Sequence, residues 1–181
     1  WVELTDAFEG MVPEGTYVSR IEPSSHDDRR FYVTFDNHRR NDFTPYVFVT
    51  DDNGASFRRI SDGIPQRWPD DGPNFVHVVR EDPVNEDLLY VGTDLGVWVS
   101  LDRGVNWQRF MEGLPTVPVH DLRIHPRDKE LIAGTHGASI WIVDVAPLQQ
   151  MAGGGMALMA EGPMLIDPAP ALQFGDRFEG G

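Results

Sequence analysis

The chain has 181 residues, the length of one ordinary domain or of part of a larger one. It carries 29 acidic and 15 basic residues, and its net charge of −14 argues against binding to nucleic acid or anionic membrane surfaces. No apolar run is long enough to insert into a membrane. The absence of cysteine excludes disulfides, thiol nucleophiles and Cys-ligated metals. The 18 glycines and 14 prolines are typical of a turn-dense β protein.

One motif occurs twice along the chain. The pattern Ser/Thr-x-Asp-x-Gly-x-x-aromatic stands at residues 50–57 and again at 100–107, and each copy is followed by Gly-(Ile/Leu)-Pro. Two alternating apolar runs, separated by a proline in an acidic turn, precede each copy. One unit therefore predicts four short strands, which in the second unit lie at 75–80, 88–93, 97–100 and 107–110. A four-stranded repeat of about 40–50 residues is typical of a β-propeller blade.

The repeat predicts an all-β fold, a partial propeller of four-stranded antiparallel blades over residues 1–148. Its first element is an orphan fourth strand, because Trp1-Val2-Glu3-Leu4 resembles Trp107-Gln108-Arg109-Phe110. In chain order we expect the orphan strand at 1–6, a blade at 14–65, a second blade at 74–115, an incomplete blade at 119–147, and a Gly-, Met- and Pro-rich linker and tail at 149–181.

The count of blades favours a piece of a longer protein. One orphan strand, two blades and part of a third fall short of the about four to eight blades that close a propeller. The remaining blades would then be this segment's first partners. Since sheet edges stay open at both ends, we expect the isolated chain to be unstable or prone to associate.

The repeated motif has a structural interpretation. An Asp in a hairpin turn accepts hydrogen bonds from its own turn, the glycine permits positive φ, and the aromatic side chain packs between sheets. A calcium loop at Asp52 is rejected because the ligand spacing and the final Glu are lacking. The residues assigned to this structural role are Thr50, Asp52, Gly54, Phe57, Ser100, Asp102, Gly104 and Trp107.

These motifs resemble the Asp-box, or BNR (bacterial neuraminidase) repeat, found in sialidases, xyloglucan-cleaving glycosidases, sortilin-type receptors and a photosystem assembly factor. Over residues 1–150 the resemblance is greatest to large bacterial glycosyl-hydrolase-like and sortilin-like multi-blade proteins. It implies a propeller, a secreted or periplasmic location, and polysaccharide or peptide ligands. It does not choose between enzyme and receptor, and the arginine triad of sialidases is not recognisable in this sequence.

In a four-stranded blade the Asp-box turn follows the third strand, so a ligand site is expected at the opposite end of the strands. Two loops there are long, at 37–45 and 61–73. The residues that we consider for a ligand-facing role are His38, Arg39, Arg40, Asp42, Trp68, Asp70, Asp71 and His136. The cationic group 38–40 would either grip an anion or pair with neighbouring aspartates, and Trp68 would either stack on a sugar or cover the sheet.

Catalytic residues are not identified by the sequence, and only weak candidates stand out. Asp36, Asp94 and His136 end the second strands of successive blades. The two aspartates would form an acid/base pair for glycoside hydrolysis or simply cap turns. The other histidines lack metal-ligand spacing, and His77 and His120 start equivalent strands, which indicates a structural reason. We expect no metal, no cofactor, and a structural or substrate-binding segment rather than a catalytic one.

Overall fold

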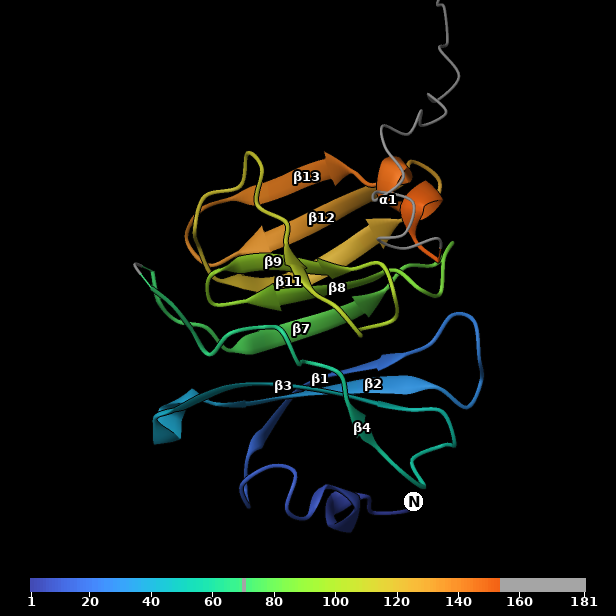
Figure 1. Cartoon of the computed structure of the whole chain (residues 1–181), viewed down its shortest axis with the longest axis vertical. Coiled ribbons are helices and arrows are strands. Elements are labelled where there is room, and N and C mark those ends of the chain that lie inside the picture. Colours follow the sequence, from blue (N-terminus) through green and yellow to red (C-terminus); the bar gives the residue numbers. More distant parts are fainter. Residues whose placement is uncertain (70, 154–181) are drawn as a thin grey trace, which may run out of the picture.

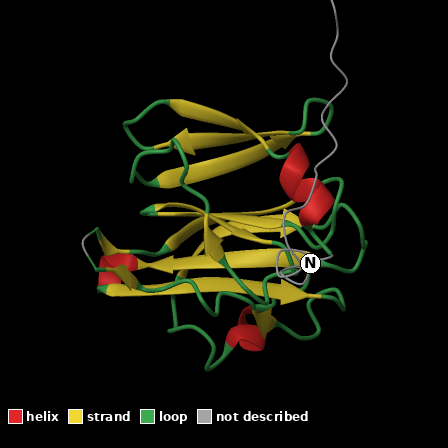
Figure 2. Ribbon diagram, turned by 45° about the horizontal axis from the view of Figure 1, so that its top comes forward, coloured by secondary structure: helices red, strands yellow, loops and turns green. Residues whose placement is uncertain are grey.

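The computed structural model describes residues 1–69 and 71–153. It consists almost entirely of strands and loops (Figure 2). The elements are η1 (Thr5–Phe8), β1 (Tyr17–Pro23), β2 (Phe31–Asn37), η2 (His38–Arg40), β3 (Asp42–Thr50), β4 (Arg58–Arg59), β5 (Arg67–Trp68), β6 (Gly72–Pro73), β7 (Val76–Glu81), β8 (Leu89–Thr93), β9 (Gly96–Ser100), β10 (Gln108–Arg109), β11 (Val119–His125), β12 (Glu130–Thr135), β13 (Ile140–Asp144) and α1 (Ala146–Met151).

Three antiparallel sheets stack in chain order (Figure 1). The first contains β1–β4 and the second β7–β10, each in sequential order, and the third contains β11–β13. The first strand of the middle blade, β7, contacts the first strands β1 and β11 of its two neighbours, as the innermost strands of propeller blades do. A small hairpin of β5 and β6 is inserted between the first two blades. The predicted all-β fold and partial propeller are confirmed.

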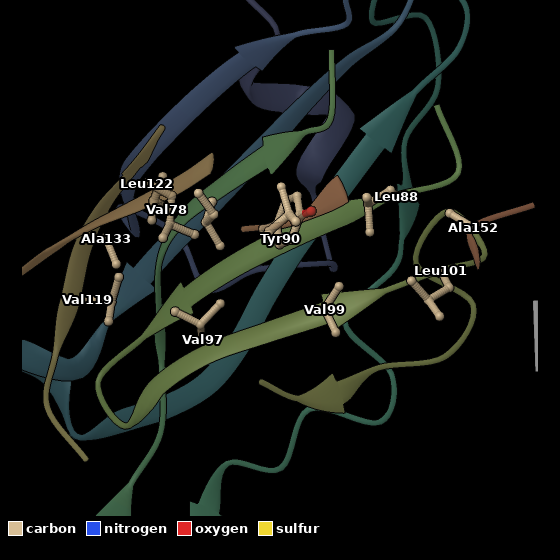
Figure 3. Packing of buried hydrophobic residues seen from close by; sticks show 12 residues of the cluster. Val78, Leu88, Tyr90, Val97, Val99, Leu101, Val119, Leu122, Ala133 and Ala152 are labelled. Carbon is tan, nitrogen blue, oxygen red and sulfur yellow. The ribbon is translucent and has the colours of Figure 1, made fainter. Parts of the chain in front are cut away.

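Apolar cores hold neighbouring blades together. Figure 3 shows the core between the second and third blades, where Tyr90 and Val97 of the second face Val119 and Leu122 of the third. Because the middle blade is covered on both sides, every residue of β8 and β9 is buried. This explains why those strands read as continuous apolar runs, while every residue of the outer strand β13 is exposed.

The two repeated turns have the same hydrogen bonds. The Asp52 carboxylate accepts the backbone N–H of Ser56 at 2.9 Å and the Thr50 hydroxyl at 2.7 Å, and Asp102 accepts the equivalent bonds from Asn106 and Ser100 at 2.8 Å each. Hydrogen bonds from Ser56, then from Thr50, lower the pKa of Asp52 to about 2. Both carboxylates thus accept hydrogen bonds from groups of their own turns.

An ion-pair network joins the first strands of all three blades. The Asp121 carboxylate of β11 lies 2.7 Å from the Arg20 guanidinium of β1 and 2.8 Å from that of Arg80 of β7. Arg80 also pairs with Glu22 and donates from Nε to the Leu122 carbonyl at 2.6 Å. The Arg80 side chain is only 3% exposed, whereas Asp121 is 47% exposed, so the network links the blades through a buried arginine and reaches the surface at Asp121.

Two expected boundaries differ from the structure. Residues 1–4 form no strand and Thr5–Phe8 form a 3-10 helix, because no neighbouring strand lies among the described residues to pair with this segment. The expected boundary between 148 and 149 falls inside α1, whose Leu148 and Met151 pack on the core between the second and third blades. The rest of the expected tail, 154–181, lies outside the described residues.

The first of the two long loops is also shorter than expected. Residues 42–45 belong to β3, where Asn37 pairs with Asp42, so the connection consists of η2 and Asn41 in a left-handed conformation at φ 61°. The second loop, 61–73, contains the β5–β6 hairpin. None of the described helices is long and apolar enough to cross a membrane.

Candidate functional site

A β-bulge interrupts the first strand of each blade at the same place. The pairing jumps from Val18 to Arg20 in β1, from Val76 to Val78 in β7 and from Val119 to Asp121 in β11. The extra residues are Ser19, His77 and His120. A bulge changes the direction of a side chain and is common beside binding sites. The equivalent positions of His77 and His120 therefore have a common cause in the backbone.

Histidines from three blades lie in one row of rings, and two of them, His77 and His120, stand at the bulges. The ring of His38 stacks on Phe75 at a centroid distance of 4.5 Å, and Phe75 meets His77 edge-on at 4.9 Å. His77 lies 4.2 Å from His120, and His120 stacks on His136 at 5.0 Å. We call His38, Phe75, His77, His120 and His136 the ring row. It lies where first strands begin and second strands end, opposite the repeated turns.

Each of the two candidate aspartates is bound to a histidine of the ring row. Both carboxylate oxygens of Asp36 lie within 2.8 Å of His38 Nδ1, and one of them also accepts the His38 backbone N–H at 2.9 Å. Asp94 lies 3.3 Å from His77 Nε2. The sequence left open whether these aspartates cap turns or form an acid/base pair. The structure places each of them against an imidazole of its own blade, where it holds the ring in position.

Electrostatics along the ring row favour a neutral imidazole at its centre. Burial lowers the pKa of His120, and the adjacent His77 and His136 lower it further, whereas Asp94 and Asp36 oppose this shift. The His120 imidazole is exposed enough to reach a ligand. At neutral pH it can therefore donate a hydrogen bond from one ring nitrogen and accept one at the other, and the tautomer decides which nitrogen does which.

The cationic group at 38–40 lies next to the ring row, and part of it is hydrogen-bonded to the backbone. Arg40 donates to the Glu14 carbonyl, while Arg39 is exposed. Partial burial raises the pKa of Asp42, but hydrogen bonds from Asn37, Thr44 and Tyr46 outweigh it and leave that pKa below its usual value. Asp42 thus supports the start of β3, and His38 is the residue of this group that joins the row.

The inserted hairpin lies against the outer part of the second blade. Trp68 meets Trp98 edge-on at 5.8 Å, and the guanidinium of Arg109 lies 4.9 Å from the centre of its ring. Arg109 also pairs with Asp71 at 3.1 Å. Of the two alternatives for Trp68, these contacts correspond to covering the sheet. Asp70 lies outside the described residues.

The sequence indicates a structural reason for His77 and His120 and does not single out Phe75 as a candidate. The sequence does contain a pattern that points to these two histidines as site residues. Both occupy the same position of the repeat, and equivalent positions lie close together around a propeller axis. Within residues 1–69 and 71–153, no three His, Asp or Glu side chains are grouped so that they could hold a metal ion.

The lowered pKa of His120 makes stability depend on pH. The unfolded chain takes up a proton near the usual value of 6.5, whereas the folded chain takes it up only at lower pH. Stability is therefore fully present above pH 6.5 and falls as the pH decreases toward the folded pKa. We expect urea unfolding to show that the change in unfolding free energy from pH 7.5 to pH 5.5 is less favourable for the unchanged chain than for a variant without the His120 imidazole.

His120→Asn is expected to flatten this dependence. The matched control is His125→Asn, at the other end of β11 and outside the ring row. An equal flattening by both variants would show that the ring row is not its source.

Comparisons with known proteins support the fold and do not identify the chain further. No family model matches the sequence, and no curated protein matches it. Among solved structures, a GH74 enzyme from Niastella koreensis matches with a TM-score of 0.54 and 15% identity over 70% of this chain. The GH74 xyloglucanase from Xanthomonas campestris matches with a TM-score of 0.55 and 18% identity over 74% of this chain.

An ancestral GH74 enzyme is similar at a TM-score of 0.50 and 19% identity over 70% of the chain. This chain covers only 21%, 21% and 17% of the three neighbours. At these identities the likeness shows the fold alone: the described residues form part of a propeller like those of glycoside hydrolases.

Proposed function

We propose that the chain is the C-terminal propeller part of a secreted or periplasmic glycoside-hydrolase-like protein, and that its ring row binds a polysaccharide without cleaving it. The observation that carries the proposal is the continuous row of five rings across three blades. A sugar presents a flat face of C–H groups that packs on rings, and hydroxyls that bond to nitrogens and oxygens beside them. Aromatic surfaces with a few fixed polar groups are typical of ligand sites.

The state of the two aspartates supports binding rather than hydrolysis. A glycosidase of the usual kind needs one carboxyl group as acid and a second, free carboxylate as base or nucleophile. Asp36 is engaged by a ring nitrogen and a backbone N–H, and Asp94 by His77. Both serve to orient imidazoles, so the polar rim of the site is built from His38, His120 and His136.

Under the same proposal the two repeated turns have a structural role. Their matching hydrogen bonds support the interpretation that they are Asp-box repeats, in which aspartate and glycine stabilise the hairpin far from the ligand. Under this proposal, the ring row contacts ligand and the turns contribute only to the rigidity of the blades.

The test is calorimetric titration of the chain with xyloglucan oligosaccharides, the substrate class named for one structural neighbour, and with cello-oligosaccharides. Binding is expected, and His120→Ala or His136→Ala is expected to weaken it at least about tenfold, equivalent to about 1.4 kcal/mol. His125→Ala, on the same strand as His120 but at its other end, should bind like the unchanged chain.

Three results would contradict the proposal. One is no binding to either glycan by a chain with a native circular dichroism spectrum. Another is equal weakening by His125→Ala. The third is release of reducing ends that Asp94→Asn abolishes, which would make the segment catalytic. Binding of peptides instead of glycans would favour a sortilin-like scaffold.

A further inference from the structure

A further aromatic side chain and an arginine adjoin the ring row on the first blade. Phe43, near the start of β3, lies 6.1 Å from Phe75 between ring centroids. The guanidinium of Arg67, in the inserted β5–β6 hairpin, lies 5.9 Å from the centre of the Phe43 ring. A ring attracts a cation to its face, so Phe43 helps to hold this guanidinium in place. The first-blade end of the ring row is therefore next to a positive charge.

The hairpin that carries Arg67 is anchored at its base. The Gln66 side chain donates to the Thr44 hydroxyl of β3 at 2.8 Å. The backbone N–H of Asn74 donates to the Gln66 carbonyl at 2.8 Å, and its side-chain amide donates to the Pro65 carbonyl at 2.9 Å. Asn74 itself is completely buried. Because the hairpin is held in this way, Arg67 needs little further ordering to bind a ligand.

A second exposed arginine lies on the other side of Phe75. Arg39 directly follows His38, whose ring stacks on Phe75. The short helix η2 that contains Arg39 is fixed at both ends, because Asp36 accepts the His38 backbone N–H and Arg40 donates to a backbone carbonyl. Helix η2 and the inserted hairpin project at the same end of the sheets (Figure 1). Two guanidinium groups thus belong to one end of the ring row.

These two arginines differ from most others in the structure, which form ion pairs with carboxylates of the protein. Within residues 1–69 and 71–153, no carboxylate oxygen lies within ion-pair distance of Arg39 or Arg67, although the chain has a net charge of −14. The nearby Asp36 and Asp94 are each bound to a histidine of their own blade. Both arginines are exposed, so they are free to bind a carboxylate that a ligand supplies.

We infer that Arg39 and Arg67 form an anion-binding end of the ring row, and that the bound polysaccharide carries carboxylate groups, as uronic-acid units do. This inference rests on the proposed function, because the rings of the row hold the sugar backbone. A guanidinium donates two parallel hydrogen bonds to the two oxygens of a carboxylate, which a neutral sugar cannot match. The glycan therefore lies with acidic units at the first blade and continues over His120 and His136.

The test compares two glycans that differ only in charge. These are cellohexaose and its cellouronic counterpart, in which carboxylates replace the primary alcohols of the same backbone. In calorimetric titration of the chain, the acidic glycan is expected to bind at least about tenfold more tightly. Raising the salt concentration from about 0.05 M to about 0.5 M should remove most of this preference, because exposed charges are then screened.

Substitutions locate the preference. Arg39→Gln and Arg67→Gln should each lower the ratio of the two affinities at least about threefold, and the double variant should remove most of the preference. Arg127→Gln is the matched control, because it removes the same charge from an exposed arginine beyond the far end of β11. It should keep the preference of the unchanged chain. Since all three side chains are exposed, a native circular dichroism spectrum is expected for each variant.

The possible failures are distinguishable. Equal affinities for the two glycans, together with weakening of both by His120→Ala, would overturn this inference and leave the proposed function standing. A preference that both arginine substitutions leave unchanged, or that Arg127→Gln lowers equally, would also overturn it. Absence of binding to either glycan by a natively folded chain would contradict the proposed function itself, and this inference with it.

Discussion

Replacing Arg80 with alanine is expected to lower the free energy of unfolding by about 3–5 kcal/mol, the usual cost of removing one partner from a buried ion pair. The guanidinium is almost completely buried and binds Glu22, Asp121 and the Leu122 carbonyl, one or more groups on each neighbouring first strand. Without it the second blade loses its ion pairs with the other two, while the Arg20–Asp121 pair remains. Glu22 then keeps a charge with less to balance it.

The Glu22 carboxyl makes the effect of Arg80→Ala on stability depend on pH. Burial already raises the pKa of Glu22, and Arg80 is the strongest influence that opposes the rise. In Arg80→Ala the folded pKa rises further above the usual 4.5, so the protonated form is favoured in the folded state. A raised carboxyl pKa adds stability at low pH that is lost as the pH increases. The loss of unfolding free energy caused by Arg80→Ala should therefore be smaller near pH 4.5 than at pH 7.5.

Urea unfolding followed by tryptophan fluorescence measures both effects. Arg127→Ala is the control, because Arg127 pairs with Asp128 at the surface with 81% of its side chain exposed, and pairs so exposed to solvent contribute little to stability. Adding Glu22→Gln to Arg80→Ala should recover part of the loss by removing the unpaired charge. A loss no larger than that of Arg127→Ala would show that the network does not hold the blades together.

Gly92→Ala is expected to destabilise the protein by about 1–3 kcal/mol or more, the range for overpacking a filled interior. A Cβ at Gly92 would lie 2.6 Å from the Val119 carbonyl oxygen and 2.7 Å from a Val78 methyl group. The closer of these two atoms belongs to the backbone of the next blade, which cannot move away by changing a rotamer. The change would therefore push the second and third blades apart.

Gly134→Ala is the matched control. Gly134 holds the same place in the third blade, where a Cβ would come no closer than 3.6 Å to the Asp121 carbonyl, an ordinary contact. Neither glycine has the positive φ that only glycine adopts readily, so the two substitutions differ in their neighbours and not in backbone strain. Thermal unfolding should show a clear decrease for Gly92→Ala and a change within about 0.5 kcal/mol for Gly134→Ala. Equal decreases would mean that the gap between blades is not the cause.

The sequence by itself determined the blade repeat and the order of its strands. The motif at 50–57 and 100–107 predicted the two hairpin turns, and in the second blade the apolar runs predicted strands within one or two residues of those observed, although the β5–β6 hairpin was not predicted. These features are local, because turn chemistry and alternation act over a few residues. The resemblance of residues 1–4 to 107–110 is also a property of the sequence, although that segment forms no strand here.

Only the tertiary structure decided which of these residues meet. His38, Phe75, His77, His120 and His136 span almost a hundred positions, yet their rings form one row because stacked blades place equivalent backbone positions side by side. The pairing of each candidate aspartate with a histidine and the buried position of Arg80 have the same origin. Each depends on packing between blades, which no short stretch of sequence contains.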